Sequence, residues 1–280
     1  GELVDFGEGQ FPGVTQPCMA LVSKRTPSGR TDEEHGKPWP MQRPDLDEVA
    51  RKILAKVANW PCLPEDLFGE RGVQSDKTLA EHFLETSKPI ERFTTPIREG
   101  TDVREFQLLP PRKHVDRDAL GNRMRSIEEF NAVRVVVRQT ARFPIAAISD
   151  GMAFRNSLLA VFENENWSAF ALVALLNSSL IRWLHYMRFR DARQPVMPQL
   201  KIGHLRAIPI PEIVSAESMQ QLEQIGKGCS GRNMGIVAKE RADLDNIIRE
   251  IYVLSPVEDE AVRAWHAAIT GTSSESTEPT

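Results

Sequence analysis

Cysteine is scarce in this chain, and histidine shows no metal-binding pattern. The 280 residues include three cysteines, Cys18, Cys62 and Cys229, which lie far apart and form no C-x-x-C pair. A disulfide framework needs paired cysteines, so we expect free thiols in a reducing, cytoplasmic setting. The six histidines form no H-x-x-x-H or H-x-x-H pair, so the sequence predicts no local zinc site.

Long hydrophobic runs are absent as well. The longest unbroken apolar run, Ala169 to Leu176, has eight residues, whereas a membrane-spanning helix needs about 20. We therefore expect a core helix there and no membrane association. No basic segment followed by an apolar one opens the chain, so secretion is not supported. Because the chain begins with Gly1, within a pattern typical of a strand, we expect a fragment of a longer protein.

The sequence has few patterns that would support catalysis. No G-x-S-x-G occurs, so a serine hydrolase of that type is not supported, and no Asp…Glu-x-Lys nuclease cluster stands out. A G-x-G-x-x-x-G pattern over 7–13 follows an expected strand, but Pro12 and Pro17 prevent the helix that a nucleotide-binding loop would open. We expect a hairpin loop instead, between strands over 3–6 and 18–23.

Charge is distributed unevenly along the chain. The whole sequence carries a formal net charge of −4, but residues 88–206 hold 19 lysines and arginines against 12 aspartates and glutamates, a net charge of +7. Sixteen of those 19 cations are arginine, whose planar guanidinium suits phosphate and the O6/N7 edge of guanine better than a lysine ammonium does. A basic centre in an acidic protein indicates an anionic polymer as partner; ordinary surface ion pairs are the alternative.

The same stretch predicts an α+β fold with a small mixed or antiparallel sheet and a long core helix. Residues 133–138 alternate valine with arginine, which is typical of a half-buried strand, and 144–149 and 157–162 are two further strand candidates. A helix is expected over 167–187, where leucines recur every four residues. Ile208 to Pro211 then forms an extended exit, because proline excludes helix.

Helices are expected on both sides of this core. Asp45 and Glu48 form a capping pattern for a helix whose apolar residues from Leu46 to Val57 share one face, and a short helix is expected over 78–85. Further helices are expected past the exit segment, over 215–227, 236–252 and 256–269. The glycine-rich segment Gly226 to Gly235 separates the first two of these, and a Ser255 capping box opens the last.

Four segments carry a resemblance to a known family. In order they are VRVVVRQTARFPIAA, NSLLAV, ALVALLNSSLIRWLHY and MPQLKIGHLRAIPIP. Together they resemble the target-recognition region of adenine-specific DNA methyltransferases, and they are similar to the TaqI-like C-terminal specificity domain of restriction–modification and phage-defence enzymes. In that family a strand with an arginine-rich end leads to a leucine-leucine-asparagine-serine helix, matched here by Asn177 and Ser178, and then to an isoleucine–proline exit.

The flanks resemble the same family. Leu3 to Arg25 resembles the last strands of such a methylase's catalytic domain, Gly100 to Phe106 resembles the opening of the recognition domain, and Leu244 to Trp265 resembles the closing helix pair. We therefore expect five parts: terminal strands of a truncated catalytic domain (1–25), a linker and helical segment (26–87), a DNA target-recognition domain (88–211), C-terminal helices (212–270) and a disordered tail (271–280).

The resemblance implies sequence-specific recognition of double-stranded DNA for an adenine-N6 methyltransferase of a restriction–modification or phage-defence system. Methyl transfer needs an S-adenosylmethionine pocket and an Asn/Asp-Pro-Pro-aromatic loop that holds the flipped base. The pair Pro110–Pro111 lies between Leu109 and Arg112 and offers neither a polar acceptor nor a ring. We expect no catalytic residue and no cofactor in this chain; an N-terminal methyltransferase domain of the same parent, with S-adenosylmethionine, would complete the enzyme.

Arginine and lysine side chains are the candidates for DNA contact. The stretch 108–126 lacks regular apolar spacing, so we expect an exposed loop whose charges are free to meet a partner. Arg134 and Arg182 are expected to pair within the fold instead. The candidates, expected to form one continuous face on the duplex, are Arg112, Lys113, Arg123, Arg125, Arg138, Arg142, Arg155, Arg188, Arg190, Arg193 and Lys201.

Two alternatives stay open at this point. A protein- or RNA-interaction module would use the same basic stretch for an acidic partner. A self-contained enzyme would need Cys62 or His114 as a catalytic residue, although nothing around either residue in the sequence predicts that role.

Overall fold

The computed structural model describes residues 2–7, 18–22, 46–74, 77–232 and 235–271, and the chain divides into two compact units, 1–51 and 52–280. In the first unit, strands β1 (Glu2–Gly7) and β2 (Cys18–Val22) pair antiparallel, with an irregularity between Asp5 and Gly7. This confirms the predicted hairpin. The predicted hairpin loop, linker and C-terminal tail lie outside the described residues.

Helix α1 (Glu48–Val57) contains the boundary between the units. Its first turn is capped by Asp47, whose Oδ1 accepts a hydrogen bond from the Ala50 N–H at 2.7 Å, so the cap predicted at Asp45 is wrong by two residues. Asp47 is better placed because an N-cap carboxylate reaches the amide three residues on. Ile53 and Val57 are buried, as the apolar face predicts.

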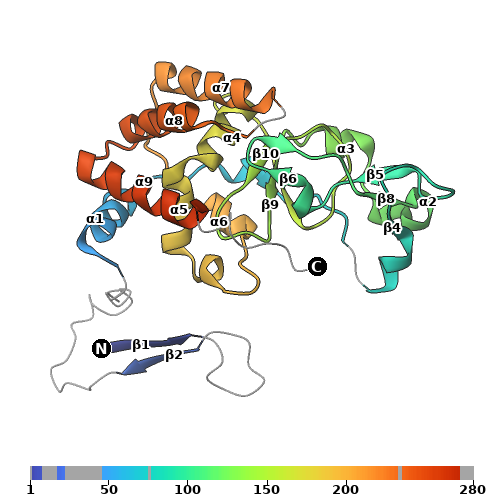
Figure 1. Cartoon of the computed structure of the whole chain (residues 1–280), viewed down its shortest axis with the longest axis horizontal. Coiled ribbons are helices and arrows are strands. Elements are labelled where there is room, and N and C mark those ends of the chain that lie inside the picture. Colours follow the sequence, from blue (N-terminus) through green and yellow to red (C-terminus); the bar gives the residue numbers. More distant parts are fainter. Residues whose placement is uncertain (1, 8–17, 23–45, 75–76, 233–234, 272–280) are drawn as a thin grey trace, which may run out of the picture. The chain divides into compact units, whose positions relative to one another are not determined.

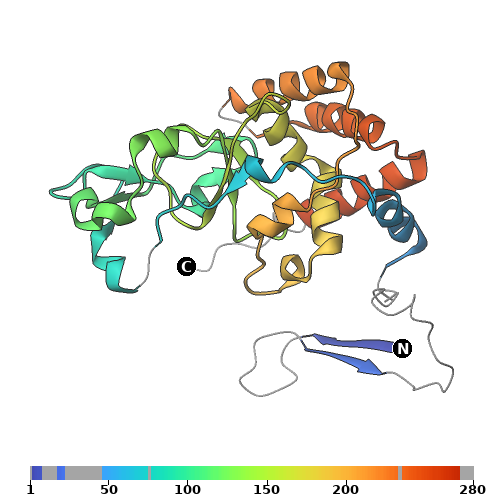
Figure 2. The same ribbon diagram turned by 180° about the vertical axis from the view of Figure 1, so that it is seen from behind.

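In the second unit, three helices lie at one end (Figures 1 and 2): α7 (Ala216–Ser230), α8 (Ala238–Ile251) and α9 (Pro256–Gly271). Three strands lie at the other end: β4 (Phe83–Glu85), β5 (Thr95–Ile97) and β8 (Lys113–Val115). Between them is a four-stranded antiparallel sheet in the order β10-β9-β11-β3. Its strands are β9 (Val135–Arg138), β10 (Ala146–Ile148), β11 (Leu158–Val161) and β3 (Phe68–Gly69). The α+β fold and the three strands predicted from 133–162 are confirmed.

Strand β9 is buried on both faces, not half-buried as its alternating pattern predicts. Val135, Val136 and Val137 are all at most 1% exposed. Helix α4 (Ala169–Asn177) packs on β9 and β10, and so does the short hairpin of β6 (Val103–Arg104) and β7 (Gln107–Leu108). Both faces of the strand are therefore covered, and only the strand ends carry arginine to the surface.

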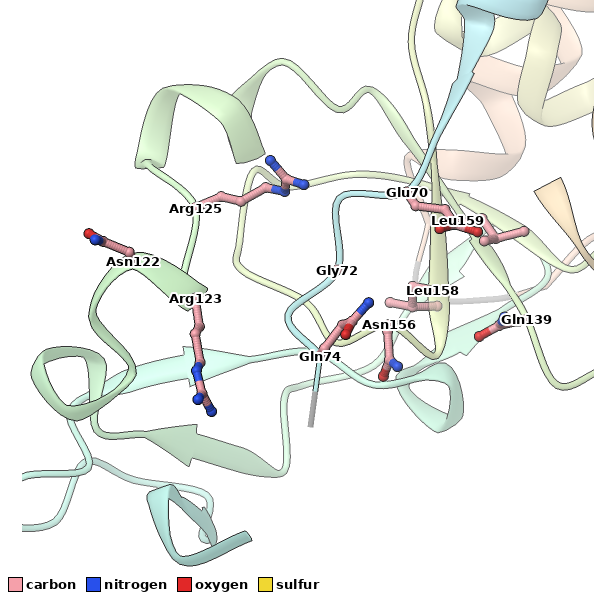
Figure 3. Close-up of a pocket in the computed structure, with 10 residues that line it drawn as sticks. All are labelled: Glu70, Gly72, Gln74, Asn122, Arg123, Arg125, Gln139, Asn156, Leu158 and Leu159. Atoms are coloured by element: carbon pink, nitrogen blue, oxygen red, sulfur yellow. The ribbon is translucent and has the colours of Figure 1, made fainter. Parts of the chain in front are cut away.

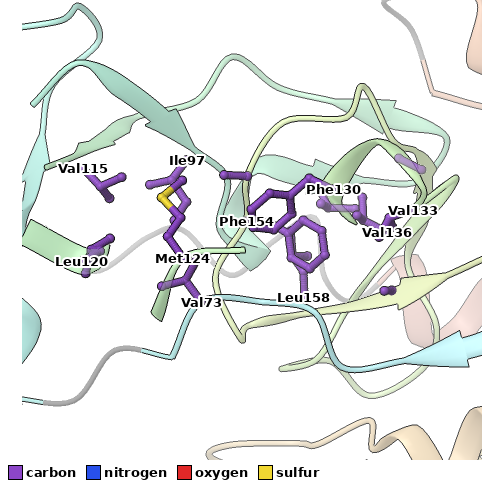
Figure 4. Close-up of a cluster of buried hydrophobic side chains, with 14 residues drawn as sticks. Val73, Ile97, Val115, Leu120, Met124, Phe130, Val133, Val136, Phe154 and Leu158 are labelled. Carbon is purple, nitrogen blue, oxygen red and sulfur yellow. The ribbon is translucent and has the colours of Figure 1, made fainter. Parts of the chain in front are cut away.

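The stretch 108–126 is part of the core, so the prediction of a free loop is wrong. Strand β8 (Lys113–Val115) is the centre of a three-stranded sheet between β4 (Phe83–Glu85) and β5 (Thr95–Ile97). Val115, Leu120 and Met124 join one buried cluster with Phe130 and Phe154 (Figure 4). The apolar residues are spaced irregularly because a strand, helix α2 (Arg117–Leu120) and helix α3 (Ile127–Asn131) follow one another within 19 residues.

The helix predicted over 167–187 is broken into α4 (Ala169–Asn177) and α5 (Ser179–Arg188). Ser178 has extended backbone angles (φ −67°, ψ 151°), and its hydroxyl accepts a hydrogen bond from the Ile181 N–H at 3.4 Å. Asn177 is fully buried and exchanges hydrogen bonds with the backbone of Ala146 at 3.1 and 2.9 Å. The asparagine thus anchors α4 to β10, and the serine starts a new helix in another direction.

The exit segment is extended, as predicted. After α6 (Ile202–Arg206), Leu63 N–H donates to the Ile208 carbonyl at 3.0 Å, and Ile210 N–H donates to the Pro61 carbonyl at 2.8 Å. The exit segment therefore runs beside residues 61–63, which lie near the start of the second unit in the sequence.

The C-terminal helices are α7 (Ala216–Ser230), α8 (Ala238–Ile251) and α9 (Pro256–Gly271). Helix α7 continues through Gly226 to Ser230, so the interruption predicted to begin at Gly226 begins later. An added Cβ would lie 2.0 Å from the Phe170 carbonyl oxygen, so glycine is needed there for close contact with α4. The Ser255 capping box is confirmed by the Ser255–Glu258 hydrogen bonds. Among the described residues, no helix has the length and hydrophobicity to cross a membrane.

Candidate nucleic-acid interface

Several predicted cations meet at one turn, residues 99–102. The Glu99 carboxylate pairs with Lys113 at 2.9 Å and also with Arg155, and Arg112 Nε lies 3.5 Å from the buried Asp102 carboxylate. Burial alone would raise the pKa of Glu99, but the hydrogen bonds from Lys113 and Arg155 outweigh it and hold that pKa below its ordinary value. The cations are held in place by carboxylates rather than left free.

A cavity of about 300 Å³ opens beside this turn, lined by Glu99, Gly100, Thr101, Arg138, Thr140, Arg155 and Ser157. Arg138 ends strand β9 and is half-buried. Among the described residues its guanidinium has no ion pair or hydrogen-bond partner. Burial, together with the charge of Arg104, lowers the pKa of Arg138, so an anion in this cavity would relieve the cost of the buried cation.

A second cavity, of about 530 Å³, is lined by Glu70, Gly72, Gln74, Asn122, Arg123, Arg125, Gln139, Asn156, Leu158 and Leu159 (Figure 3). Its polar lining consists of four amides, two arginines and one glutamate. Arg125 pairs with Glu129 one helical turn on, at 3.0 Å. Arg123 is exposed and has no partner among the described residues. We call this the amide cavity.

A third group of cations lies on residues 188–201. Lys201 pairs with Asp191 at 2.8 Å, and Arg188 donates to the Ala207 carbonyl. Leu200 N–H donates to the Gln139 carbonyl at 2.7 Å, and the backbones of Gln199 and Thr140 form an isolated antiparallel β-bridge. The segment is therefore fastened to residues 139–140, which line both cavities.

Comparison with known proteins agrees with this arrangement. Residues 95–210 match the family model of the TaqI-like C-terminal specificity domain. The match covers less than half of the chain, and it confirms for this segment the resemblance predicted from the sequence. A specificity domain of this family implies DNA recognition in a restriction–modification setting.

Other comparisons add little. No curated protein matches the chain. A chain of the structure described as "Structural basis underlying complex assembly and conformational transition of the type I R-M system" has 13% identity and a TM-score of 0.34, over 75% of this chain and 44% of that chain. This chain thus spans less than half the length of that one, and a likeness of this strength carries no inference.

The predicted cations all fall inside the matched segment 95–210, but several of them are not free charges. Five of the eleven are in carboxylate pairs: Arg112, Lys113, Arg125, Arg155 and Lys201. Arg142 is exposed, and Arg190 and Arg193 lie on a short 3-10 turn. The sequence alone does not show which acidic residue folds back on each cation, and the predicted continuous face stays a prediction. Arg134 and Arg182 pair within the fold, with Glu163 and Glu105, as predicted.

The structure also brings together residues that the sequence did not single out. Arg98 is buried and forms two hydrogen bonds with the Asp150 carboxylate, at 3.2 and 2.6 Å, which fixes the strand that leads into the Glu99 turn. Gln74, Asn122, Gln139 and Asn156 line the amide cavity. No short motif marks these amides, because they come from four separate segments and meet only in the folded chain.

The enzyme alternative gains no support at its two named residues. Cys62 is exposed, and its backbone forms an isolated antiparallel β-bridge with Pro209. His114 is buried, with Nδ1 3.0 Å from the Thr86 carbonyl oxygen. In the part of the chain that the structure describes, no group of three His, Cys, Asp or Glu side chains could hold a metal ion.

Proposed function

We propose that this chain supplies sequence-specific recognition of double-stranded DNA for an adenine-N6 methyltransferase of a restriction–modification or phage-defence system. The observation that carries the proposal is that all eleven candidate cations lie within the segment that matches the specificity domain, residues 95–210. The same segment holds most of the stretch in which basic residues outnumber acidic ones by seven.

In this proposal, the carboxylate pairs position cations and do not cancel them. Arg112 keeps 61% of its side chain exposed while it pairs with Asp102 and Thr101. A guanidinium held by one carboxylate still has free N–H groups for a phosphate. Arg138, which has no partner among the described residues, would hold a phosphate directly in the cavity beside the Glu99 turn.

The methyl-transfer chemistry would belong to the rest of the parent protein. An N-terminal methyltransferase domain would bind S-adenosylmethionine and the flipped adenine, while this chain fixes the register of that domain on the duplex. We propose that domain as the partner of this chain.

A salt titration tests the proposal. With about six phosphates neutralised, duplex affinity should fall about 10³-fold between 50 and 200 mM salt. Arg138→Ala should reduce the slope of log K against log salt by about one. Arg134→Ala is the matched control, because Arg134 lies at the other end of the same strand and is paired with Glu163.

The outcomes separate the candidate functions. No binding to any duplex at low salt contradicts the proposal. Stronger binding to RNA or to an acidic protein than to duplex DNA favours the interaction module instead.

A further inference from the structure

The amide cavity gathers more hydrogen-bonding capacity than the fold uses. Among the described residues, the side-chain amides of Gln74, Asn122, Gln139 and Asn156 make no hydrogen bond. Each amide offers a donor and an acceptor side by side. A single unpartnered amide on a surface is ordinary, but four around one cavity form a site that could match a partner with alternating donors and acceptors.

Two of these residues, Gln74 and Asn156, lie on backbone segments that are hydrogen-bonded to each other. Val73 N–H donates to the Phe154 carbonyl at 2.8 Å, and Asn156 N–H donates to the Val73 carbonyl at 3.0 Å. A Cβ added to Gly72 would lie 2.5 Å from the backbone of Arg155, so the two segments lie backbone to backbone. Val73 itself is buried in the core cluster (Figure 4). Gln74 and Asn156 are therefore neighbours whose backbones cannot shift independently, as a reading site requires.

The chemistry of this pair fits one base in particular. In the major groove, adenine presents the N6 amino donor beside the N7 acceptor, and a side-chain amide satisfies both at once. Guanine presents two acceptors and would repel the amide oxygen. Arg123, on the rim of the same cavity, is exposed and unpaired among the described residues, so it can hold a neighbouring phosphate.

We propose that Gln74 and Asn156 are specificity-determining residues that read adenine edges in the major groove of the target duplex. The inference rests on the proposed DNA recognition and adds the base class and the residues that read it. Gln74 lies outside the matched segment 95–210, so the reading site extends beyond the specificity domain as the family match delimits it.

The first experiment identifies the preferred site. The full chain selects from a random duplex pool, and the preferred sequence is compared for the wild type, Gln74→Ala, Asn156→Ala and Asn156→Asp. Each alanine variant should lose about ten- to a hundredfold preference for adenine at one position. Asn156→Asp should shift that position toward cytosine, because a carboxylate accepts from the cytosine N4 amino group. Asn166→Ala, at an exposed asparagine outside the cavity, should leave the preference unchanged.

The second experiment tests the contact itself. Replacing the selected adenine with 7-deazaadenine removes the N7 acceptor, so the wild type should lose about tenfold affinity. Asn156→Ala or Gln74→Ala, whichever changed that position, should lose nothing further, which is the coupling that a direct contact requires. Binding to unrelated duplex and its salt dependence should be unchanged in both variants.

The results distinguish this inference from the proposed function. If the wild type binds duplex DNA but the variants keep its preference and its sensitivity to 7-deazaadenine, the reading role is wrong and DNA recognition stands. Wild-type binding without any base preference also overturns the reading role. If the wild type binds no duplex at all, both are wrong.

Discussion

Arginine is buried on helix α5 and exposed at the residue just before strand β9. In the first region Arg182 has only 2% of its side chain exposed, and it donates to the Pro144 carbonyl at 3.1 Å, to Glu105 at 3.2 Å and to Asn177 at 3.0 Å. In the second region Arg134 is 51% exposed and pairs with Glu163 at 3.0 Å.

The difference separates cations that hold the fold from cations that are available to a partner. Arg182 cannot leave its site without leaving two buried partners unpaired, the Pro144 carbonyl and the Asn177 side chain. Arg134, which our proposal does not place on DNA, exchanges Glu163 for water at small cost, and the exposed Arg112 near the Glu99 turn can exchange its partner in the same way. The same residue type thus serves stability in one region and, in our proposal, binding in the other.

Removing the buried arginine should have the largest effect on stability. Arg182→Ala should lower the free energy of unfolding by about 3–5 kcal/mol, because it leaves buried acceptors unpaired. Arg134→Ala should change the same quantity by about 1 kcal/mol or less. Urea unfolding followed by circular dichroism measures both, and similar losses in the two variants would contradict the distinction.

A fall in pH should cause the next largest loss in the free energy of unfolding. Burial, Arg182 and Arg241 lower the pKa of His266 to about 3, and burial followed by His204 lowers that of His185 to about 4. Both folded-state pKa values lie below that of the unfolded chain, so stability is complete above about pH 6.5 and is lost as pH falls toward 4. The slope is at most about 1.4 kcal/mol per pH unit for each histidine.

His266→Gln should make that pH dependence shallower between pH 6.5 and 4. Unfolding in urea at pH 7, 6 and 5 gives the slope for the wild type and the variant. Parallel slopes would show that His266 is not one of the groups that take up protons on unfolding.

At the Glu99 turn, neutralising the carboxylate should affect binding more than folding. Glu99→Gln removes the charge that holds Lys113 and Arg155 in place, so duplex affinity should fall a few-fold because the two cations lose their fixed positions. Glu165→Gln, at an exposed glutamate, makes the same charge change away from the turn and is the control. Stronger binding by Glu99→Gln would mean that the carboxylate cancels the charge of the two cations instead of positioning them.

The smallest effect on stability is expected at the amide cavity. Arg125 pairs with Glu129 at i,i+4 spacing on the surface, and such pairs contribute about 0.3–0.5 kcal/mol. Arg125→Ala should therefore unfold almost as the wild type does in urea. If Arg125→Ala lowered the free energy of unfolding by more than about 1 kcal/mol, Arg125 would stabilise the fold as Arg182 does.

Local patterns in the sequence were enough to predict the elements with strong, continuous signals. The strands within 133–162, the exit at Ile208 to Pro211 and the Ser255 capping box all depend on neighbouring residues alone. Strand β8 was missed because Lys113, His114 and Val115 carry no alternating pattern, and the strand is defined by its partners β4 and β5. The break at Ser178 was missed because the apolar spacing continues on both sides of it.

The candidate site was predictable in its charge but not in its contacts. The excess of arginine over 88–206 is a property of composition. Which arginine meets Glu99, Asp102 or Glu129 depends on long-range packing, as does the meeting of Gln74 with Asn156 across 82 positions of sequence. The prediction that Val135 to Val137 form a half-buried strand was wrong for the same reason. The residues that bury this strand come from segments distant in the sequence.

The close contact of Gly226 with Phe170 has a consequence for transplanting DNA specificity between proteins. The matched segment ends at residue 210, yet α4 inside it is buried nearly all round, partly by α7 beyond that end. A graft of 95–210 alone would leave the apolar outer surface of α4 in water. A chimaera that exchanges recognition should therefore carry the chain through α9, and on the N-terminal side should include β3 and Gln74.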